Sequence, residues 1–385
     1  MIDRTQLIMF VKSLKLLGFR NYLEAAIEFN QSKTIIIGKN AQGKTNLLEV
    51  IQILSHVKSR RASRDSDLVH FDLGEAIIHA IAERKQEELE IALLIRRSGK
   101  RTLKINEISH KPNELLHHIF SVSFMVDDIE IINGSPSHRR DWLDSVIAQL
   151  DFGYKDKLTK FEKILAQRNS FFKELVEAGS YYYRDLNTSQ QDQLMVWDEL
   201  YIAAANEMTG LRANFIMELE PIAARYYSEI SGSDTVLALD YMGMQIDQEA
   251  LEDVRARDFA RGYSNIGPHR DEIKFLLNGS LAASFASQGE RRSITLAIKL
   301  AELELHKTKH GEYPILLLDD VLAELDEDRQ DYLLECINPQ TQVIITTTHI
   351  GKHLEKWSEN AQIMEIEAGR VMGTSSESTL CYDIV

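Results

Sequence analysis

The chain has 385 residues, 44% of them hydrophobic, and a formal net charge of −15. Its length predicts two or three packing units, and its charge argues against nucleic-acid binding over the whole surface, although local basic patches stay possible because screening limits each charge to about 10 Å. The sequence shows no apolar run of about 18 residues, no signal-peptide pattern at residues 1–5, and only two distant cysteines, Cys336 and Cys381; we therefore expect a cytoplasmic protein with no membrane association, no disulfide framework and no zinc site.

The first elements predict a phosphate-binding loop. Residues 7–29 read as two strands, and the apolar run 34–37 leads into a G-x-x-x-x-G-K-[ST] segment that precedes a helical pattern. Glycines let backbone N–H groups converge on phosphate oxygens, and the start of a helix adds partial positive charge. An ordinary glycine turn before a helix is the alternative. The pattern predicts ATP and Mg²⁺ binding, with Lys44 on the β- and γ-phosphates and Thr45 on the metal. The predicted ATP-binding residues are Gly38, Lys39, Asn40, Ala41, Gln42, Gly43, Lys44 and Thr45.

Residues 75–107 alternate between apolar and polar positions, which predicts an antiparallel meander. One basic cluster precedes this region, at 56–64, and a second lies within it around a hairpin turn, at 96–104; neither contains an acidic residue. Basic loops at a hairpin tip suit contacts with DNA phosphates, but a solvated surface turn is an equal alternative. The candidate DNA-binding residues are Lys58, Arg60, Arg61, Arg64, Arg96, Arg97, Lys100 and Arg101.

The middle of the chain is helical in period. The patterns cover 155–179 and 190–232, with a loop-like stretch at 180–188, and Pro221 should kink the second helix or start a new turn. Neither helix carries a heptad repeat long enough for a rod-like coiled coil. We expect a helical subdomain at 141–262, inserted between two halves of an ATPase domain at 1–140 and 263–385.

The last part returns to alternating strands and helices. The turn Ser287, Gln288, Gly289 and Glu290 precedes an amphipathic helix and resembles a second phosphate site, although such a turn is also a common helix cap. A buried strand at 313–318 then ends at two acids. Asp319 is the expected Mg²⁺ ligand and Asp320 the group that orients or deprotonates water, unless the two acids only cap a loop.

Two further segments fit the same series. Glu324, Leu325 and Asp326 follow the acidic strand, as the D-loop does in ABC-type ATPases. His349 follows the predicted strand 342–347, where those enzymes place a histidine near the γ-phosphate; a surface histidine is the alternative. A last edge strand is expected at 364–371, with a turn at Ala368 and Gly369.

Several motifs resemble the RecF family of bacterial recombination-repair ATPases, and the resemblance runs nearly end to end. Generic transporter ATPases lack the paired arginines and the G-P-H-R-D element. Val126 departs from the family's usual proline, and Glu290 stands where glutamine is commoner. The matching segments are 19–22 (FRNY), 43–49 (GKTNLLE), 133–144 with Arg139 and Arg140, 266–271 (IGPHRD), 287–289 (SQG) and 318–320 (LDD).

The resemblance implies an α/β fold of the ABC-type ATPase head, a mixed sheet with a P-loop helix plus an antiparallel meander. It implies that two chains sandwich two ATP molecules, with Ser287 and Gly289 of one completing the site around Lys44 of the other. Hydrolysis, with Asp320 and His349 as catalytic residues, would be slow and would release the dimer. It further implies binding to gapped or junction duplex DNA and assistance to RecA loading with RecO and RecR.

Two other functions remain as alternatives. A transporter-energising subunit would need a transporter-type signature and a surface for membrane partners. A structural chromosome protein of the SMC type would need long heptad arms, and an insert of about 120 residues is too short for them at about 1.5 Å per residue. Arg139 and Arg140 are expected either in ion pairs or near the nucleotide.

Overall fold

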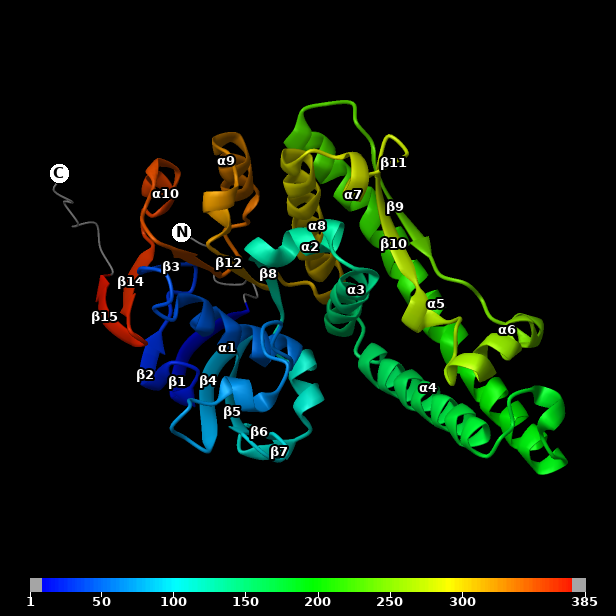
Figure 1. Cartoon of the computed structure of the whole chain (residues 1–385). Coiled ribbons are helices and arrows are strands. Elements are labelled where there is room, and N and C mark those ends of the chain that lie inside the picture. Colours follow the sequence, from blue (N-terminus) through cyan, green and yellow to red (C-terminus); the bar gives the residue numbers. More distant parts are fainter. Residues whose placement is uncertain (1–8, 376–385) are drawn as a thin grey trace. The chain divides into compact units, whose positions relative to one another are not determined.

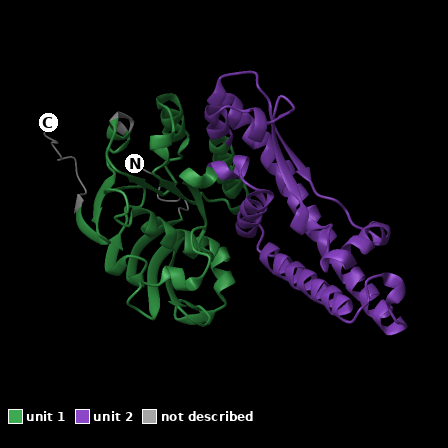
Figure 2. Cartoon of the chain, viewed as in Figure 1, with its two compact units in different colours: residues 1–128, 295–385 green, residues 129–294 purple. Residues whose placement is uncertain are grey.

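The computed structural model describes residues 9–375, so residues 1–5 and Cys381 lie outside the described part of the chain. Its backbone forms two compact units, one made of residues 1–128 and 295–385 and the other of residues 129–294 (Figures 1 and 2). Unit 2 is therefore larger at both ends than the insertion expected at 141–262. It also includes the start of the helix that follows Ser287.

Unit 1 contains an antiparallel sheet, here called the meander sheet, with strand order β2-β1-β4-β5-β6-β7. Buried and exposed residues alternate along its strands, as expected where one face is covered. The expected meander is thus present, and β1 and β2 extend it. The strands are β1 (Phe10–Phe19), β2 (Tyr22–Glu28), β4 (Glu75–Arg84), β5 (Glu87–Arg96), β6 (Thr102–Ile105) and β7 (Ile108–His110).

The second sheet of unit 1, here called the P-loop sheet, has the order β15-β14-β3-β13-β12-β8. All its pairings are parallel except that of β14 with β15. β8 and β12 are buried along their whole length, which explains the continuous apolar run 315–318 in β12. The strands are β3 (Lys33–Ile37), β8 (Ser121–Met125), β12 (Ile315–Asp319), β13 (Val343–Thr347), β14 (Gln362–Glu367) and β15 (Arg370–Ser375).

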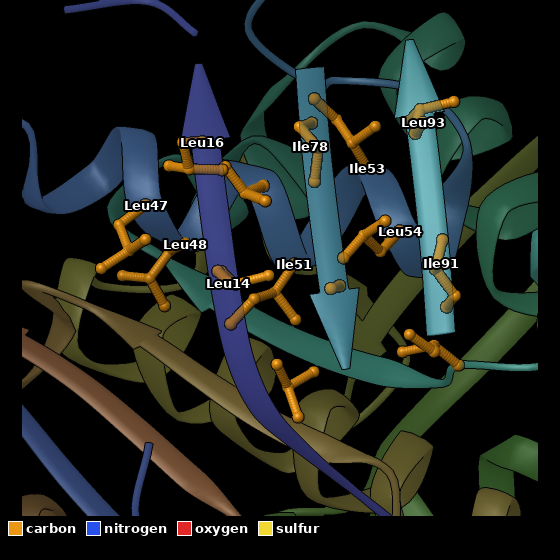
Figure 3. Close-up of a cluster of buried hydrophobic side chains, with 14 of the residues drawn as sticks. Leu14, Leu16, Leu47, Leu48, Ile51, Ile53, Leu54, Ile78, Ile91 and Leu93 are labelled. Carbon is orange, nitrogen blue, oxygen red and sulfur yellow. The ribbon is translucent and has the colours of Figure 1, made fainter. Parts of the chain in front are cut away.

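Helix α1 (Lys44–His56) packs against both sheets of unit 1. Figure 3 shows its leucines and isoleucines beside Leu14 and Leu16 of β1, Ile78 of β4 and Ile91 of β5. The same buried cluster takes in Ile36, Leu317 and Ile344 of the P-loop sheet. Burying this apolar surface on both sides fixes the start of α1, and with it the glycine loop, against the strand ends. Unit 1 also holds α9 (Glu327–Cys336) and α10 (Lys352–Trp357).

Unit 2 combines helices with the three-stranded sheet β11-β10-β9. Helix α8 starts in unit 2 and continues into unit 1. The elements are α2 (Glu130–Asn133), α3 (Pro136–Leu150), α4 (Tyr154–Glu177), α5 (Thr188–Ser231), α6 (Gln248–Arg261), α7 (Ala282–Phe285), α8 (Gln288–His310), β9 (Leu237–Met242), β10 (Glu272–Leu277) and β11 (Ser280–Leu281).

Pro221 lies inside α5, which is one helix of 44 residues, so no new helix starts there. The proline removes one backbone N–H, but it lies on an exposed stretch near Met217, where water can solvate the carbonyl that lacks its partner.

A buried charge network joins three helices of unit 2. The Arg168 guanidinium on α4 is fully buried and donates to Asp198 of α5 at 2.8 and 2.9 Å and to Asp258 of α6 at 3.1 Å. Removing one partner would leave a buried charge uncompensated, so the network ties the three helices to one arrangement.

None of the helices within residues 9–375 combines the length and the hydropathy of a membrane span.

Candidate nucleotide site and basic surface

The predicted glycine loop lies between the end of β3 and the start of α1. Gly43 has a φ of 115°, a conformation that side chains rarely adopt. A Cβ on Gly38 would lie 2.4 Å from the carbonyl oxygen of Ile366 in β14, so that position has no room for a side chain. The local structure therefore requires glycine at both positions. The loop itself lies at the carboxyl ends of the parallel strands, because it follows β3 directly.

Lys44 is buried, and its amine lies over the loop. Its Nζ donates to the carbonyl oxygens of Gly38 at 2.7 Å and Lys39 at 3.2 Å, and lies 3.8 Å from a carboxylate oxygen of Asp320. The ammonium group of Lys44 thus lies between the loop and the acidic strand, where it could pair with a bound phosphate.

Thr45 and Asp319 are brought together from opposite ends of the chain. The Thr45 hydroxyl donates to Asp319 Oδ1 at 3.0 Å, and the Thr346 hydroxyl of β13 donates to the same oxygen at 2.6 Å. Burial raises the pKa of Asp319, and these two hydrogen bonds offset part of the rise. The predicted metal ligands therefore share one location.

Asp320 follows β12 in the left-handed region, with a φ of 51°. Its backbone N–H donates to the Thr346 hydroxyl at 3.0 Å, so Thr346 orients both acids. The exposed side chain of His349 follows β13, the neighbour of β12, and its Nδ1 lies 3.1 Å from the Thr348 hydroxyl.

The D-loop segment also lies in unit 1. Leu325 is buried, while the Asp326 carboxylate accepts from the backbone N–H of Arg329 at 3.0 Å and caps α9. Asp326 therefore has a structural task besides the predicted one, and Glu324 ends the short turn that precedes it.

Residues that the sequence analysis did not assign to the site brace the loop. The side chain of Asn21, in the β1–β2 turn, donates to the carbonyl oxygen of Gln42 at 3.0 Å and accepts from the Asn46 side chain at 2.8 Å. The Tyr22 hydroxyl donates to the carbonyl oxygen of Gly43 at 2.9 Å. On the other side, Gly369 N donates to the Gln42 carbonyl oxygen at 2.9 Å. The F-R-N-Y motif was the available signal, since it holds both Asn21 and Tyr22.

Arg20 of the same turn is bound to α1. Its guanidinium makes two hydrogen bonds, at 2.7 and 2.8 Å, to the fully buried carboxylate of Glu49. This bidentate pair fixes the turn on the helix that follows the loop.

The predicted signature turn lies in unit 2, at the start of α8. Ser287 is exposed, and both its backbone N–H and its hydroxyl donate to Glu290 Oε2 at 2.7 Å. Glu290 N in turn donates to the Ser287 hydroxyl at 3.2 Å, which makes a capping box.

The first basic cluster divides into different environments. Arg60 pairs with the buried carboxylate of Asp128 at 2.7 Å, and Arg61 donates to the Asn46 side chain at 3.0 Å, beside the glycine loop. Lys58 and Arg64 are exposed.

The arginines of the second basic cluster hold the fold of the hairpin. Arg97 donates to the carbonyl oxygens of Leu73 at 2.7 Å and His70 at 2.8 Å, and Arg101 makes a bidentate pair with Asp65 at 2.6 and 2.9 Å. Arg96 donates to the Thr102 hydroxyl at 3.1 Å and to the Lys100 carbonyl oxygen at 3.2 Å. Exposed Lys100 and Lys104 remain for an external ligand: no described residue makes a hydrogen bond or ion pair with either ammonium group.

The paired arginines and the G-P-H-R-D element contact each other within unit 2. Arg139 makes a bidentate pair with Glu272 at 2.6 and 2.9 Å, and Arg140 donates to the Asp271 carbonyl oxygen at 2.9 Å. Gly267 has a φ of 129°, and a Cβ there would lie 2.0 Å from the Tyr201 hydroxyl. Of the two expectations for the arginines, the structure thus gives Arg139 the ion pair.

Comparison with known proteins identifies the family. The model of the RecF/RecN/SMC N terminal domain matches residues 10–371. The chain is 38% identical to the DNA replication and repair protein RecF of Acaryochloris marina over 94% of this chain and 99% of that protein. It is equally identical to that of Synechocystis sp., over 94% and 98%.

Solved structures give the same result for the fold. A structure of the recombination mediator protein RecF with ATP in the RecFOR pathway superposes with a TM-score of 0.87 at 30% identity, covering 97% of this chain and 100% of that one. An SMC head domain from Pyrococcus furiosus reaches 0.54 at 18% identity, over 96% and 97%, which supports the ABC-type head fold alone. With a family model over nearly the whole chain and relatives that match it over almost their whole length, the chain belongs to the RecF family of DNA replication and repair proteins.

Proposed function

We propose that this chain is an ATP-dependent DNA-binding protein of recombinational repair and replication. The observation that carries the proposal is that Lys44, Thr45 and Asp319 lie together at the carboxyl ends of the strands of the P-loop sheet. The chain also superposes over 97% of its length on a RecF structure with ATP. A triphosphate would be met there by the loop N–H groups and by Lys44.

Mg²⁺ fits the same residues. A threonine hydroxyl and an aspartate carboxylate are the hard oxygen donors that this ion prefers, and neighbouring ligands of an octahedral ion at about 2.1 Å lie about 3 Å apart. The 3.0 Å between Thr45 Oγ1 and Asp319 Oδ1 agrees with that spacing. The metal would offset phosphate charge, while Asp320 would orient water and His349 would contact the γ-phosphate.

We propose that ATP joins two copies of the chain, with Ser287 and Gly289 of one reaching the phosphate held by Lys44 of the other. The exposure of Ser287 in this chain supports such a contact. Hydrolysis would release the dimer, and we expect it to be slow because Asp320 is one methylene shorter than the glutamate usual in ABC transporters.

The DNA ligand is proposed to be gapped or junction duplex. Phosphate contacts would come from exposed basic residues of the two clusters, Lys58, Arg64, Lys100 and Lys104. Known RecF structures are described as belonging to the RecFOR pathway. On that basis the proposed partners are RecR with RecO and, through them, RecA, in the cytoplasm.

DNA binding by the wild-type protein and by Lys44→Ala, with and without ATP, on gapped and blunt duplexes tests the proposal. We expect ATP to strengthen wild-type binding to gapped duplex and to leave Lys44→Ala unchanged. An ATP effect that survives in Lys44→Ala would refute the role of this loop. Sedimentation velocity tests pairing: Ser287→Arg should bind ATP but stay monomeric, and ATP-dependent dimers of that variant would contradict the contact in trans.

A further inference from the structure

Two donors of the signature turn are already engaged within their own chain. The Ser287 hydroxyl and the Ser287 backbone N–H both donate to the same carboxylate oxygen of Glu290 at 2.7 Å. The hydrogen bond from the Ser287 hydroxyl, and to a smaller extent the one from its backbone N–H, hold the pKa of Glu290 below its usual value. At neutral pH the side chain is therefore a carboxylate that accepts and cannot donate.

The single proton of the Ser287 hydroxyl limits what the turn can bind. A serine hydroxyl has one proton, so it cannot donate to Glu290 and to a phosphate oxygen at once. A phosphate oxygen at hydrogen-bond distance from the hydroxyl would lie within about 3 to 5 Å of the carboxylate oxygen, because both lie about 2.7 Å from one atom. At that distance two negative groups repel each other.

We propose that Glu290 is a built-in brake on ATP-driven pairing of this chain: it withholds the Ser287 donors and repels the γ-phosphate that the partner presents. The inference rests on the proposed contact in trans. Pairing then requires the capping box to open, and each dimer carries the cost twice because it contains two such contacts.

Glutamine at this position would remove the charge repulsion, one of the two parts of the brake, without removing the cap. Its side-chain oxygen can still accept from Ser287, since glutamate and glutamine both serve in capping boxes. Its amide group is neutral and adds two N–H donors that can face a phosphate. The substitution Glu290→Gln thus tests the effect of the negative charge while the structure of the turn is kept.

The test measures the ATP-dependent dimerisation constant of the wild type, Glu290→Gln and the control Glu249→Gln by sedimentation velocity. Like Glu290, Glu249 is an acid in the first turn of a helix, and it is exposed, so the control makes the same change in net charge. We expect Glu290→Gln to pair about tenfold more tightly for each contact, Glu249→Gln to match the wild type, and the difference to shrink as salt is raised.

Several results would overturn the brake. Dimers of Glu290→Gln that are no tighter than wild-type dimers would refute it while leaving the ATP-joined dimer intact, as would equal tightening by both variants. If neither wild type nor Glu290→Gln pairs with ATP at any concentration, the brake and the proposed dimer both fail. ATP binding by each variant and its thermal unfolding midpoint establish that the compared proteins are folded.

Discussion

The Thr45 hydroxyl donates to the Asp319 carboxylate across 3.0 Å, although the two residues are 274 positions apart. This hydrogen bond joins the first turn of α1 to the end of β12, so both halves of the nucleotide site are aligned by the fold itself. Burial of the apolar face of α1 on one side and of β12 on the other holds the pair in place.

Thr45→Ala should remove most of the gain in ATP affinity that Mg²⁺ brings. The variant loses one of the two oxygens expected to hold the ion, whereas Lys44 and the loop N–H groups still meet the phosphates. Nucleotide titrations with Mg²⁺ and with EDTA measure the gain. Thr45→Ser keeps the hydroxyl and should keep the gain; a full gain in Thr45→Ala would contradict the assignment.

Asn21→Ala should weaken ATP binding about three- to tenfold while the protein stays folded. The side chain braces the loop through Gln42 and Asn46 but is expected to make no contact with nucleotide, so its removal frees the loop without deleting a ligand. A fluorescent-nucleotide titration measures the loss. Asn113→Ala, an exposed asparagine of the same unit, should bind like the wild type.

Gly369→Ala should destabilise the protein by about 1–3 kcal/mol. Gly369 has a φ of 73°, and a Cβ would lie 2.4 Å from the carbonyl oxygen of Asn21, so backbone must move. Urea unfolding gives the free-energy change. Gly373→Ala, in the strand β15 that follows this turn, meets nothing within 4 Å and should cost less than about 1 kcal/mol. If both variants lose the same free energy of unfolding, the turn at Gly369 accommodates a side chain with little strain.

The ion pair between Arg139 and Glu272 should give a pH-dependent stability. Partial burial raises the pKa of Glu272, but the hydrogen bonds from Arg139 and from the Ile273 N–H outweigh burial and keep the pKa below its usual 4.5. Because the folded pKa is lowered, the contribution is present above pH 4.5 and is lost as pH falls through the folded value.

Glu272→Gln tests this pair, because glutamine resembles the protonated glutamate. The variant should be about 0.5–1 kcal/mol less stable than the wild type at pH 7, and the two should converge below the folded pKa of Glu272. Urea unfolding at several pH values measures the gap. A gap that stays constant with pH would mean that the charge of Glu272 contributes nothing.

Replacing Lys58, Lys100 and Lys104 with alanine should weaken binding to duplex DNA and flatten its salt dependence. For every phosphate that the variant no longer neutralises, the slope of log K against log salt should fall by about 0.9. These lysines are exposed, whereas Arg97 and Arg101 hold the hairpin, so alanine at the arginines would confuse binding with folding. The exposed set Lys160, Lys163 and Lys173 on α4 removes the same charge and should leave the slope unchanged.

Local patterns in the sequence were enough to place the loop 38–45, the helix after it and the acidic strand, since each depends on neighbours within a few residues. The role of Asn21 was not predictable in this way, because its partner Gln42 meets it only after β1, β2 and β3 have found their places. The same holds for Arg101, whose partner Asp65 lies on another segment and makes a predicted basic surface partly structural. Pro221 predicted an interruption of the helix, but α5 continues through this residue because its other backbone hydrogen bonds and packing hold it together.

The left-handed backbone at Asp320 restricts which acid can stand there. Among non-glycine residues, aspartate and asparagine tolerate a φ near 51° best, and a longer side chain such as glutamate costs about 1 kcal/mol or more. Lengthening the acid to accelerate hydrolysis would thus work against the turn that carries it. If the acid at this position limits the rate of ATP hydrolysis, that rate is set by the backbone conformation after β12. A faster variant would then need a different turn at residue 320 as well as a longer acid.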